Sequence, residues 1–259
     1  MKREFSRLQI LCYRARFCEL LRWGLVVVVC FLFEVAASQS ITKDYLLGRF
    51  NPEADNRFQK IPAEYSSGSA NGGYLRKEVL QAFGKMRQAA KNDGVTLTIV
   101  SATRNFQRQK SIWESKWTGK TLVEGQDVSQ INDSAARAKI ILRFSAMPGT
   151  SRHHWGTDMD LNDLEDAYFQ TPEGKKVYAW LIANAPKFGF CQPYTSKLNS
   201  NRTGYEEEKW HWSYLPLSSE LLKQYEQSFD ANDLNGFKGS TTAEAIEVVK
   251  RYVGGVSCK

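Results

Sequence analysis

All three histidines of the chain fall in two short tracts, residues 151–160 and residues 208–214. Both tracts also carry closely spaced carboxylates, among them Asp158, Asp160 and Glu208. Any chemistry that depends on histidine is therefore confined to these two stretches. A site that uses both tracts requires a fold in which two distant stretches of backbone meet.

The composition is that of an ordinary soluble globular protein. Of the 259 residues, 42% are hydrophobic, 24% are charged and 12% are aromatic. These values argue against a disordered, fibrous or multi-span membrane protein. At roughly 100–200 residues per domain, the length allows one large domain or two small ones. Five cysteines are too few for a small disulfide scaffold.

Residues 1–37 have the order of a secretory signal peptide. Six basic residues begin the segment, an uncharged apolar run follows from Trp23 to Phe33, and small residues then offer a cleavage site. The apolar run is shorter than the ~20 residues that span a bilayer. An uncleaved amphipathic anchor is the alternative. We therefore expect export to the periplasm or cell wall, with no stable membrane span once the segment is removed.

Removal of residues 1–37 changes both the charge and the cysteine count. The segment holds six basic and three acidic residues, so the formal net charge falls from +7 to +4. The rest of the chain has no basic block with interleaved aromatic residues, which disfavours nucleic-acid binding. Attraction to an anionic cell envelope remains reasonable. Cys191 and Cys258 remain, and in an oxidising compartment they predict one disulfide that ties down the C-terminus.

Composition and hydrophobic periodicity divide the remainder into an arm and one domain. Residues 38–73 are rich in Ser, Asn and Gly and predict an irregular arm. Residues 74–259 mix helical and strand patterns without βαβ regularity, which predicts a single α+β domain. The expected helices are 74–92, 105–117, 133–144, 172–187, 217–228 and 241–252, and the expected strands are 95–99, 153–161 and 208–214.

The two histidine tracts supply the ligands of a catalytic zinc site. Such a site takes three protein ligands from His and Asp or Glu and leaves a fourth position for water, whose pKa the metal lowers toward ~7. One His and one Asp of the first tract make that set with His211. Glu208 is the natural proton acceptor beside the metal. Positions three apart on a strand face opposite ways, so Glu208 and His211 can face one metal only if the chain bends near Trp210.

Three motifs follow one another between residues 74 and 215. They read Ser-x-x-Arg with Gln five residues later, Ser-x-His-x-x-Gly-x-x-x-Asp, and Glu-x-Trp-His-x-x-Tyr. Their residues are Ser101, Arg104 and Gln109 in the first, Ser151, His153, Gly156 and Asp160 in the second, and Glu208, Trp210, His211 and Tyr214 in the third. In order and spacing the chain resembles the D-alanyl-D-alanine carboxypeptidases of the zinc metallopeptidase group that also includes the D-Ala-D-Ala dipeptidases and lysostaphin.

The resemblance implies a small, mainly antiparallel sheet that is flanked by helices and holds one zinc ion. It implies that the zinc ligands are His153, Asp160 and His211. Glu208 is then the general base and afterwards the general acid. Arg104 stabilises the substrate carbonyl oxygen as it becomes an oxyanion, a role that suits a guanidinium because it stays charged at any working pH.

Several positions keep an alternative. Asp158 stands where the family has a small residue, so it competes for the metal, holds a ligand histidine, binds a substrate amine or is simply solvated. His154 is adjacent to His153 and could be the metal ligand instead, although the three-residue spacing to the motif glycine selects His153. Glu208 alone is a solvated charge in an acidic run, and Arg104 is a cap of the next helix. Four further residues are weaker candidates for the site: Ser151, Gln109, Trp210 and Tyr214. Tyr214 is equally well explained as a residue of the hydrophobic core.

The resemblance implies a peptidase whose partner is a peptidoglycan stem peptide, most simply one that loses its terminal D-Ala, and the signal-peptide pattern of residues 1–37 predicts that it is exported. An endopeptidase on cross-links and a D-Ala-D-Ala dipeptidase keep the same chemistry. A non-catalytic cell-wall-binding protein is a distant alternative, because structural zinc sites are usually closed and Cys-rich. The oligomeric state stays open.

Overall fold

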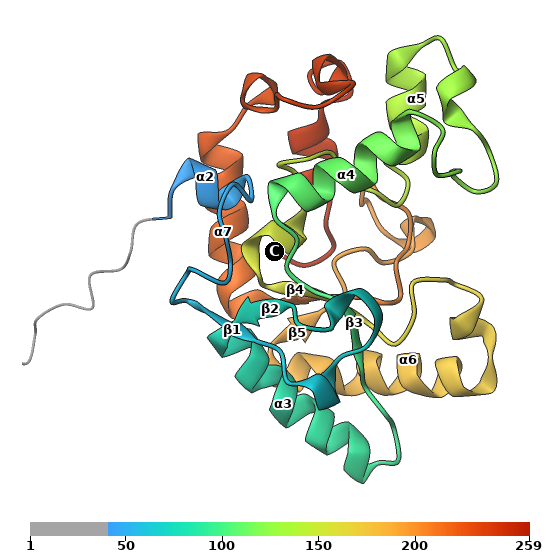
Figure 1. Cartoon of the computed structure of the whole chain (residues 1–259). Coiled ribbons are helices and arrows are strands. Elements are labelled where there is room, and N and C mark those ends of the chain that lie inside the picture. The colour runs from blue at the N-terminus through green and yellow to red at the C-terminus, as the bar shows by residue number, and fades with distance from the viewer. Residues whose placement is uncertain (1–40) are drawn as a thin grey trace, which may run out of the picture. The chain divides into compact units, whose positions relative to one another are not determined.

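A four-stranded sheet in the order β3-β4-β6-β5 organises the computed structural model, which describes residues 41–259 (Figure 1). Every neighbouring pair is antiparallel. The strands are β3 (Ile99–Ser101), β4 (Asp158–Leu161), β5 (Phe190–Cys191) and β6 (His211–Tyr214). With helices around this sheet in the single unit 42–259, the predicted α+β class is confirmed. The predicted signal peptide lies outside the described residues.

Alternation along β4 divides its side chains between the two faces of the sheet. Met159 and Leu161 join the main hydrophobic core, to which β6 contributes Trp212. Asp158 and Asp160 share the opposite face, because successive residues of a strand point to opposite sides. All four residues of β4 are buried, so the sheet has an apolar face and a face that carries buried carboxylates.

Helices α3 (Lys77–Asn92) and α6 (Pro172–Asn184) cover the apolar face and lie below the sheet in Figure 1. Helix α3 starts three residues later than predicted because residues 74–76 pair as a strand. Its buried side chains recur at helical spacing and contribute to the core, as predicted: Val79, Phe83, Met86 and Ala90.

Three helices lie on the other side or at the edge of the sheet. Helix α4 (Phe106–Trp117) runs above the sheet in Figure 1, with α5 (Ser134–Ile141) beside it and α7 (Leu215–Ser228) following β6 directly. The side chains of Asn105 and Asp133 accept hydrogen bonds from first-turn N–H groups of α4 and α5. These N-caps fix where the two helices begin, close to the predicted starts at residues 105 and 133.

The described part of the arm is more regular than predicted. Its elements include α2 (Lys43–Leu46) and β1 (Phe58–Lys60), and β1 pairs with β2 (Tyr74–Arg76). The Tyr45 hydroxyl donates to the Trp155 carbonyl oxygen at 2.5 Å, and the Trp155 indole donates back to the arm at 3.1 Å. The arm therefore braces the turn that leads into β4.

Two predicted strands begin later than expected. The strand predicted over 153–161 begins at Asp158, because Arg152–Trp155 forms a 3-10 turn that Gly156 ends with a φ of +72°. The strand predicted over 208–214 begins at His211, after a turn. Both shifts place an irregular backbone where the motifs lie.

Three further predicted elements differ in the structure. The strand predicted over 95–99 lies at 99–101, where β4 offers a partner. The helix predicted over 172–187 ends at Asn184 and continues as a 3-10 turn that contains Pro186. Residues 241–252 form turns and a short π-helix (Val249–Val253), with Glu247 interrupting them at a φ of +55°. A left-handed residue cannot continue a right-handed helix.

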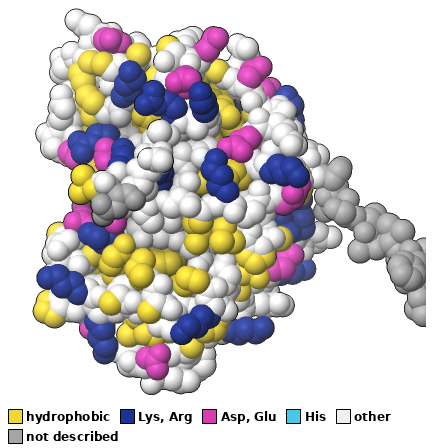
Figure 2. Space-filling model, turned by 180° about the vertical axis from the view of Figure 1, so that it is seen from behind, with side chains coloured by type: hydrophobic (Ala, Val, Ile, Leu, Met, Phe, Trp, Pro, Cys, Tyr) yellow, Lys and Arg dark blue, Asp and Glu magenta, His cyan; other side chains and the backbone are white. Residues whose placement is uncertain are grey.

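Within residues 41–259, no helix combines the length and the apolar character that crossing a membrane requires. On the face in Figure 2, Lys and Arg side chains are interspersed with Asp and Glu, and no histidine is visible. The histidines are buried, since His153, His154 and His211 are at most 3% exposed.

The predicted disulfide between Cys191 and Cys258 is confirmed. Cys191 lies on the edge strand β5, and the two cysteines are 67 residues apart in sequence. A backbone hydrogen bond of 2.9 Å from Ser257 to the Pro193 carbonyl runs beside the bridge. The bridge therefore holds the C-terminus against the edge of the sheet.

We expect replacement of both Cys191 and Cys258 by Ser to lower the free energy of unfolding by about 4 kcal/mol, because the bridge restricts a long loop in the unfolded chain. Equilibrium urea denaturation measures the change. Wild-type protein treated with a reductant should shift in the same direction. An unchanged unfolding midpoint in the double variant would contradict the expectation.

Candidate metal centre

Two of the predicted ligands face each other across β4 and β6. In the antiparallel register Asp160 lies directly opposite His211, where Cβ atoms are ~4.5–5.5 Å apart. His211 Nδ1 is 3.2 Å from Asp160 Oδ1. His153 approaches from the turn before β4, with its Nε2 3.3 Å from Asp160 Oδ2. One ligand atom from each residue lies within 4.8 Å of the others, so the two histidine tracts meet at one point.

The orientation of His153 is set by the backbone around it. Its Nδ1 lies 2.9 Å from the Ala102 carbonyl oxygen, an acceptor that assigns the proton to Nδ1 and leaves a lone pair on Nε2. Gly156 ends the turn in the left-handed region, and a Cβ there would lie 2.3 Å from the Phe58 ring. The motif glycine is therefore required by this turn, which presents His153 to the site.

Two buried polar atoms without a partner mark the position for an ion. Among the described residues, neither His153 Nε2 nor Asp160 Oδ1 has a hydrogen-bond partner. Leaving such atoms buried and unsatisfied costs free energy. Burial lowers the pKa of His153 to about 4, and Arg104 acts in the same direction, so the ring is neutral at neutral pH. A divalent cation bound here would satisfy both atoms.

The charge around His211 also fits a cation. Burial by itself lowers the pKa of His211, but contacts with Asp158, Asp160 and Glu208 raise it well above its ordinary value. Burial opposes ionisation of Asp160, yet His153 and His211 hold the pKa of this carboxyl well below its usual range. In the metal-free protein a proton on His211 balances part of this negative charge. A metal ion takes the place of that proton, since it binds only a deprotonated ring nitrogen.

Asp158 holds the far side of the His211 ring. Its Oδ2 lies 2.9 Å from His211 Nε2 and accepts a hydrogen bond from Arg152 Nε at 2.8 Å. Its Oδ1 accepts from the hydroxyls of Thr157 and Ser213 at 2.7 and 2.9 Å. Of the alternatives for Asp158, this geometry favours contact with a ligand histidine over solvation. The group of residues that could hold a metal does not include it.

Sequence reasoning missed the partners of Asp158. Ser213 follows His211 by two residues on β6, so the two side chains lie on the same face of the strand. Alternation along this strand could therefore have indicated Ser213 as a partner. Arg152 is 1% exposed and pairs with Asp158 deep in the protein. The sequence carries no signal for that pairing, because it depends on the 3-10 turn that replaces the expected strand.

A turn brings Glu208 to the metal side of His211. Lys209 and Trp210 form this turn, and the His211 N–H donates to the Glu208 carbonyl oxygen at 3.3 Å. This is the bend that the motif requires. Glu208 Oε2 lies 3.3 Å from His211 Nδ1. Burial raises the pKa of Glu208 while His211 opposes the shift, so this carboxyl holds a proton more readily than an exposed one.

Arg104 lies in the loop after β3 and is attached to the turn that carries the ligand. Its N–H donates to the His153 carbonyl oxygen at 3.2 Å, and its own carbonyl oxygen accepts from His154 Nδ1 at 2.5 Å. Its Nε is buried and has no hydrogen-bond partner among residues 41–259. Its charge also lowers the pKa of both His153 and Glu208. The alternative as a helix cap fails, because the Asn105 side chain caps α4.

His154 does not reach the site. It accepts a hydrogen bond from the Gly149 N–H at 3.0 Å through Nε2, and its Nδ1 is engaged by Arg104. Ser151 is buried and its carbonyl oxygen accepts from the His154 N–H. Gln109 donates to the Ala146 carbonyl oxygen at 2.8 Å, and its buried Oε1 has no partner among the described residues.

The two aromatic candidates pack away from the ligands. Tyr214 alternates with His211 to the core side of β6, where its ring lies 5.2 Å from that of Phe190. The core alternative for Tyr214 is therefore the one the structure favours. Trp210 is buried against Phe169, with ring centroids 6.3 Å apart.

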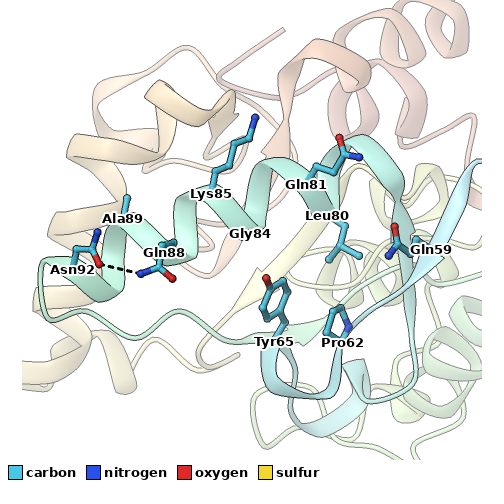
Figure 3. A pocket seen from close by; sticks show the side chains of 10 residues that line it. All are labelled: Gln59, Pro62, Tyr65, Leu80, Gln81, Gly84, Lys85, Gln88, Ala89 and Asn92. Carbon is cyan, nitrogen blue, oxygen red and sulfur yellow. Dashed lines mark hydrogen bonds between the residues drawn. The ribbon is translucent and has the colours of Figure 1, made fainter.

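Two surface grooves lie outside this cluster. A groove of about 710 Å³ follows α3 and the arm, lined by residues such as Tyr65, Gln81 and Gln88 (Figure 3). None of the candidate site residues lines it. A second groove of about 650 Å³, here called the α4 groove, is lined by basic side chains and Glu114. Its basic residues are Arg108, Lys116, Lys120 and Lys238.

A family model described as VanY, D-alanyl-D-alanine carboxypeptidase, matches residues 72–217 of the chain. The match covers more than half of the sequence and includes every candidate ligand. The chain belongs to this family. The resemblance drawn from three motifs is thereby confirmed for the carboxypeptidase family as a whole.

Two relatives of this chain in curated sequences are moderately similar to it. The YodJ protein of Bacillus subtilis is 33% identical over 148 residues, which are 55% of this chain and 46% of that protein. A D-alanyl-D-alanine carboxypeptidase of Enterococcus faecalis is 29% identical over 175 residues, 66% of this chain and 60% of that protein. The chain thus spans about half to three fifths of the length of these relatives.

A solved structure of the vancomycin-resistance D,D-pentapeptidase VanY in complex with Zn(II) is also similar. It is 27% identical, covers 68% of this chain and 94% of its own, and superposes with a TM-score of 0.43.

In this VanY-family chain, we expect Asp158→Asn to weaken binding of a divalent metal by about 10- to 100-fold, because the carboxylate that orients His211 is lost. Isothermal titration of the metal-free protein with Zn²⁺ measures the affinity. Asp163→Asn, which changes a half-buried carboxylate outside the cluster, is the matched control. Wild-type affinity in Asp158→Asn would show that the His211 contact does not support the centre.

Proposed function

We propose that the chain is an exported zinc carboxypeptidase that removes the terminal D-Ala from peptidoglycan stem peptides ending in D-Ala-D-Ala. The observation that carries the proposal is the buried convergence of His153, Asp160 and His211, with Glu208 beside them, in a VanY-family chain. An endopeptidase or a dipeptidase would use the same residues, so the products decide among the three.

Zinc is the metal that this donor set favours. Two imidazole nitrogens and one carboxylate are typical of open, catalytic zinc sites, whereas Mg²⁺ and Ca²⁺ prefer oxygen ligands alone. When bound, zinc supplies a Lewis acid and lowers the pKa of a water ligand toward ~7. Both cysteines of residues 41–259 are joined in the disulfide, which leaves no thiolate for a Cys-rich structural site.

Glu208 is the group that moves the proton. Its carboxylate accepts a proton from the attacking water while the water oxygen bonds to the scissile carbonyl carbon. It then passes that proton to the amine nitrogen as the C–N bond breaks and D-Ala leaves. Both transfers are helped by a carboxyl that takes up a proton readily, and burial shifts the pKa of Glu208 in that direction.

Arg104 binds the carbonyl oxygen on which negative charge develops. Its guanidinium is charged at every working pH, and its buried Nε has no protein partner among residues 41–259. Its backbone N–H and carbonyl oxygen are held by His153 and His154, which anchors the residue beside the turn that carries the candidate ligand. A donor held in this way is worth several kcal/mol in the transition state.

Export and chain organisation complete the proposal. Residues 1–37 act as the signal peptide, residues 38–73 form the arm, and residues 74–259 form the catalytic domain. Peptidoglycan lies outside the cytoplasm, so an enzyme that acts on it must be exported. The basic start and the apolar run of residues 1–37 are typical of a segment that directs export. N-terminal sequencing of the protein recovered from the cell envelope tests it, since a start at Met1 would contradict cleavage.

We expect Glu208→Gln to retain zinc and to lose turnover by about 10²- to 10⁴-fold, because the proton acceptor is replaced by an amide of the same shape. Metal analysis and mass spectrometry of digested muropeptides measure the two effects. Loss of one Ala from stem peptides is the expected wild-type product. Release of a dipeptide or cleavage of cross-linked dimers would instead identify the dipeptidase or endopeptidase.

Two further variants are controls for the Glu208→Gln experiment. Glu207→Gln alters the neighbouring carboxylate of the same acidic run and should keep wild-type turnover. His211→Ala should lose both zinc and activity, because it removes a ligand rather than a proton carrier. Full activity in Glu208→Gln would exclude this carboxylate from the mechanism, and an unchanged zinc content in His211→Ala would exclude the metal centre.

A further inference from the structure

Gln192 connects the end of β5 to the backbone of Glu208. Its side chain is buried, and its Nε2 donates to the carbonyl oxygens of Tyr194 and Glu208 at 3.1 and 3.0 Å. Its Oε1 accepts from the Tyr178 hydroxyl of α6 at 2.9 Å. Carbonyl oxygens only accept, so the amide can face them in one orientation only. Both donor positions and the acceptor of this buried amide are therefore used.

The two carbonyl oxygens that Gln192 binds belong to residues that also bind each other. The Glu208 N–H donates to the Tyr194 carbonyl oxygen at 2.9 Å, and the Glu208 carbonyl oxygen also accepts from the His211 N–H at 3.3 Å. Glu208 precedes β6, which begins at His211, so strand pairing does not hold it. Its N–H and its carbonyl oxygen are instead held by the segment after β5, and the carbonyl oxygen is held through Gln192.

The segment after β5 is itself anchored. The disulfide holds the end of β5, and the Pro193 carbonyl oxygen accepts from the Ser257 N–H at 2.9 Å. The ring of Tyr194 also packs edge-on against the ring of His211, with centroids 4.7 Å apart. The amide of Gln192 therefore joins the proposed proton carrier to a segment that is held both by the C-terminus and by a candidate ligand.

We propose that Gln192 is a positioning residue for Glu208, and that its amide fixes the backbone from which the carboxylate reaches the site. The Glu208 carboxylate lies 3.3 Å from His211 Nδ1, and a displacement of ~1 Å near the reacting groups lowers a rate by about 100-fold. This inference rests on the proposed function and deepens it, because it assigns the placement of the proton carrier to a residue outside the three motifs.

The test compares cleavage of a stem peptide that ends in D-Ala-D-Ala by wild-type protein and by Gln192→Met. The variant keeps the length of the side chain and removes both donors. We expect kcat to fall by about 10- to 100-fold while KM stays within about twofold. Zinc affinity, measured by isothermal titration, should be unchanged, because the hydrogen bonds of Gln192 do not involve the side chains of the candidate ligands.

Tyr178→Phe is the matched control. It removes one hydrogen bond from the same amide and leaves both bonds to the carbonyl oxygens. Urea denaturation should show that both variants are less stable than wild type, yet only Gln192→Met should lose kcat. An equal loss of kcat in Tyr178→Phe would mean that Gln192 contributes stability alone, and would overturn the inference. Gln192→Glu offers at most one donor, so it should also lower kcat and takes the place of Gln192→Met if that variant does not fold.

A double variant decides whether Gln192 acts through Glu208. In Glu208→Gln the proton carrier is already lost, so the addition of Gln192→Met should lower kcat no further. Losses that multiply in the double variant, a weaker zinc affinity in Gln192→Met or an unchanged kcat would each overturn this inference and leave the proposed function intact. Absence of peptidase activity in wild type would overturn the proposed function and this inference together.

Discussion

The pairing of Asp160 with His211 across β4 and β6 is the constraint on which the site depends. Directly opposed residues of an antiparallel pair carry their side chains on one face at a nearly fixed separation. Two candidate ligands are thereby placed by backbone hydrogen bonds rather than by flexible loops. The third, His153, needs a different device, and a 3-10 turn ended by Gly156 brings it over the same face. A one-residue slip of register would move Asp160 and His211 apart.

The same face of the sheet also buries a charged pair outside the candidate ligands. Arg152 and Asp158 form an ion pair that is almost wholly inaccessible to solvent. Burying such a pair is costly unless its remaining hydrogen-bond positions are filled. Here Thr157, Ser213 and His211 fill those of the carboxylate. Arg152 Nη1 has no partner among the described residues, so this network offsets part of the cost while it orients the ring of a candidate ligand.

Much of this site could be predicted because its residues lie in short motifs. Spacing alone distinguished His153 from His154 and indicated that the chain must bend before His211. The Asp158 alternatives could not be decided, because its partner Arg152 becomes visible only when the expected strand is replaced by a turn.

The sequence by itself determined the residue types that chemistry requires, the helical face of α3, the starts of α4 and α5, and the pairing of Cys191 with Cys258. These depend on local periodicity, local hydrogen bonds or simple counting. Only the tertiary structure decided which carboxylates surround His211 and which side of β6 carries Tyr214. Those outcomes depend on strand register and on turns ended by left-handed residues, and both are set by packing between segments far apart in the chain.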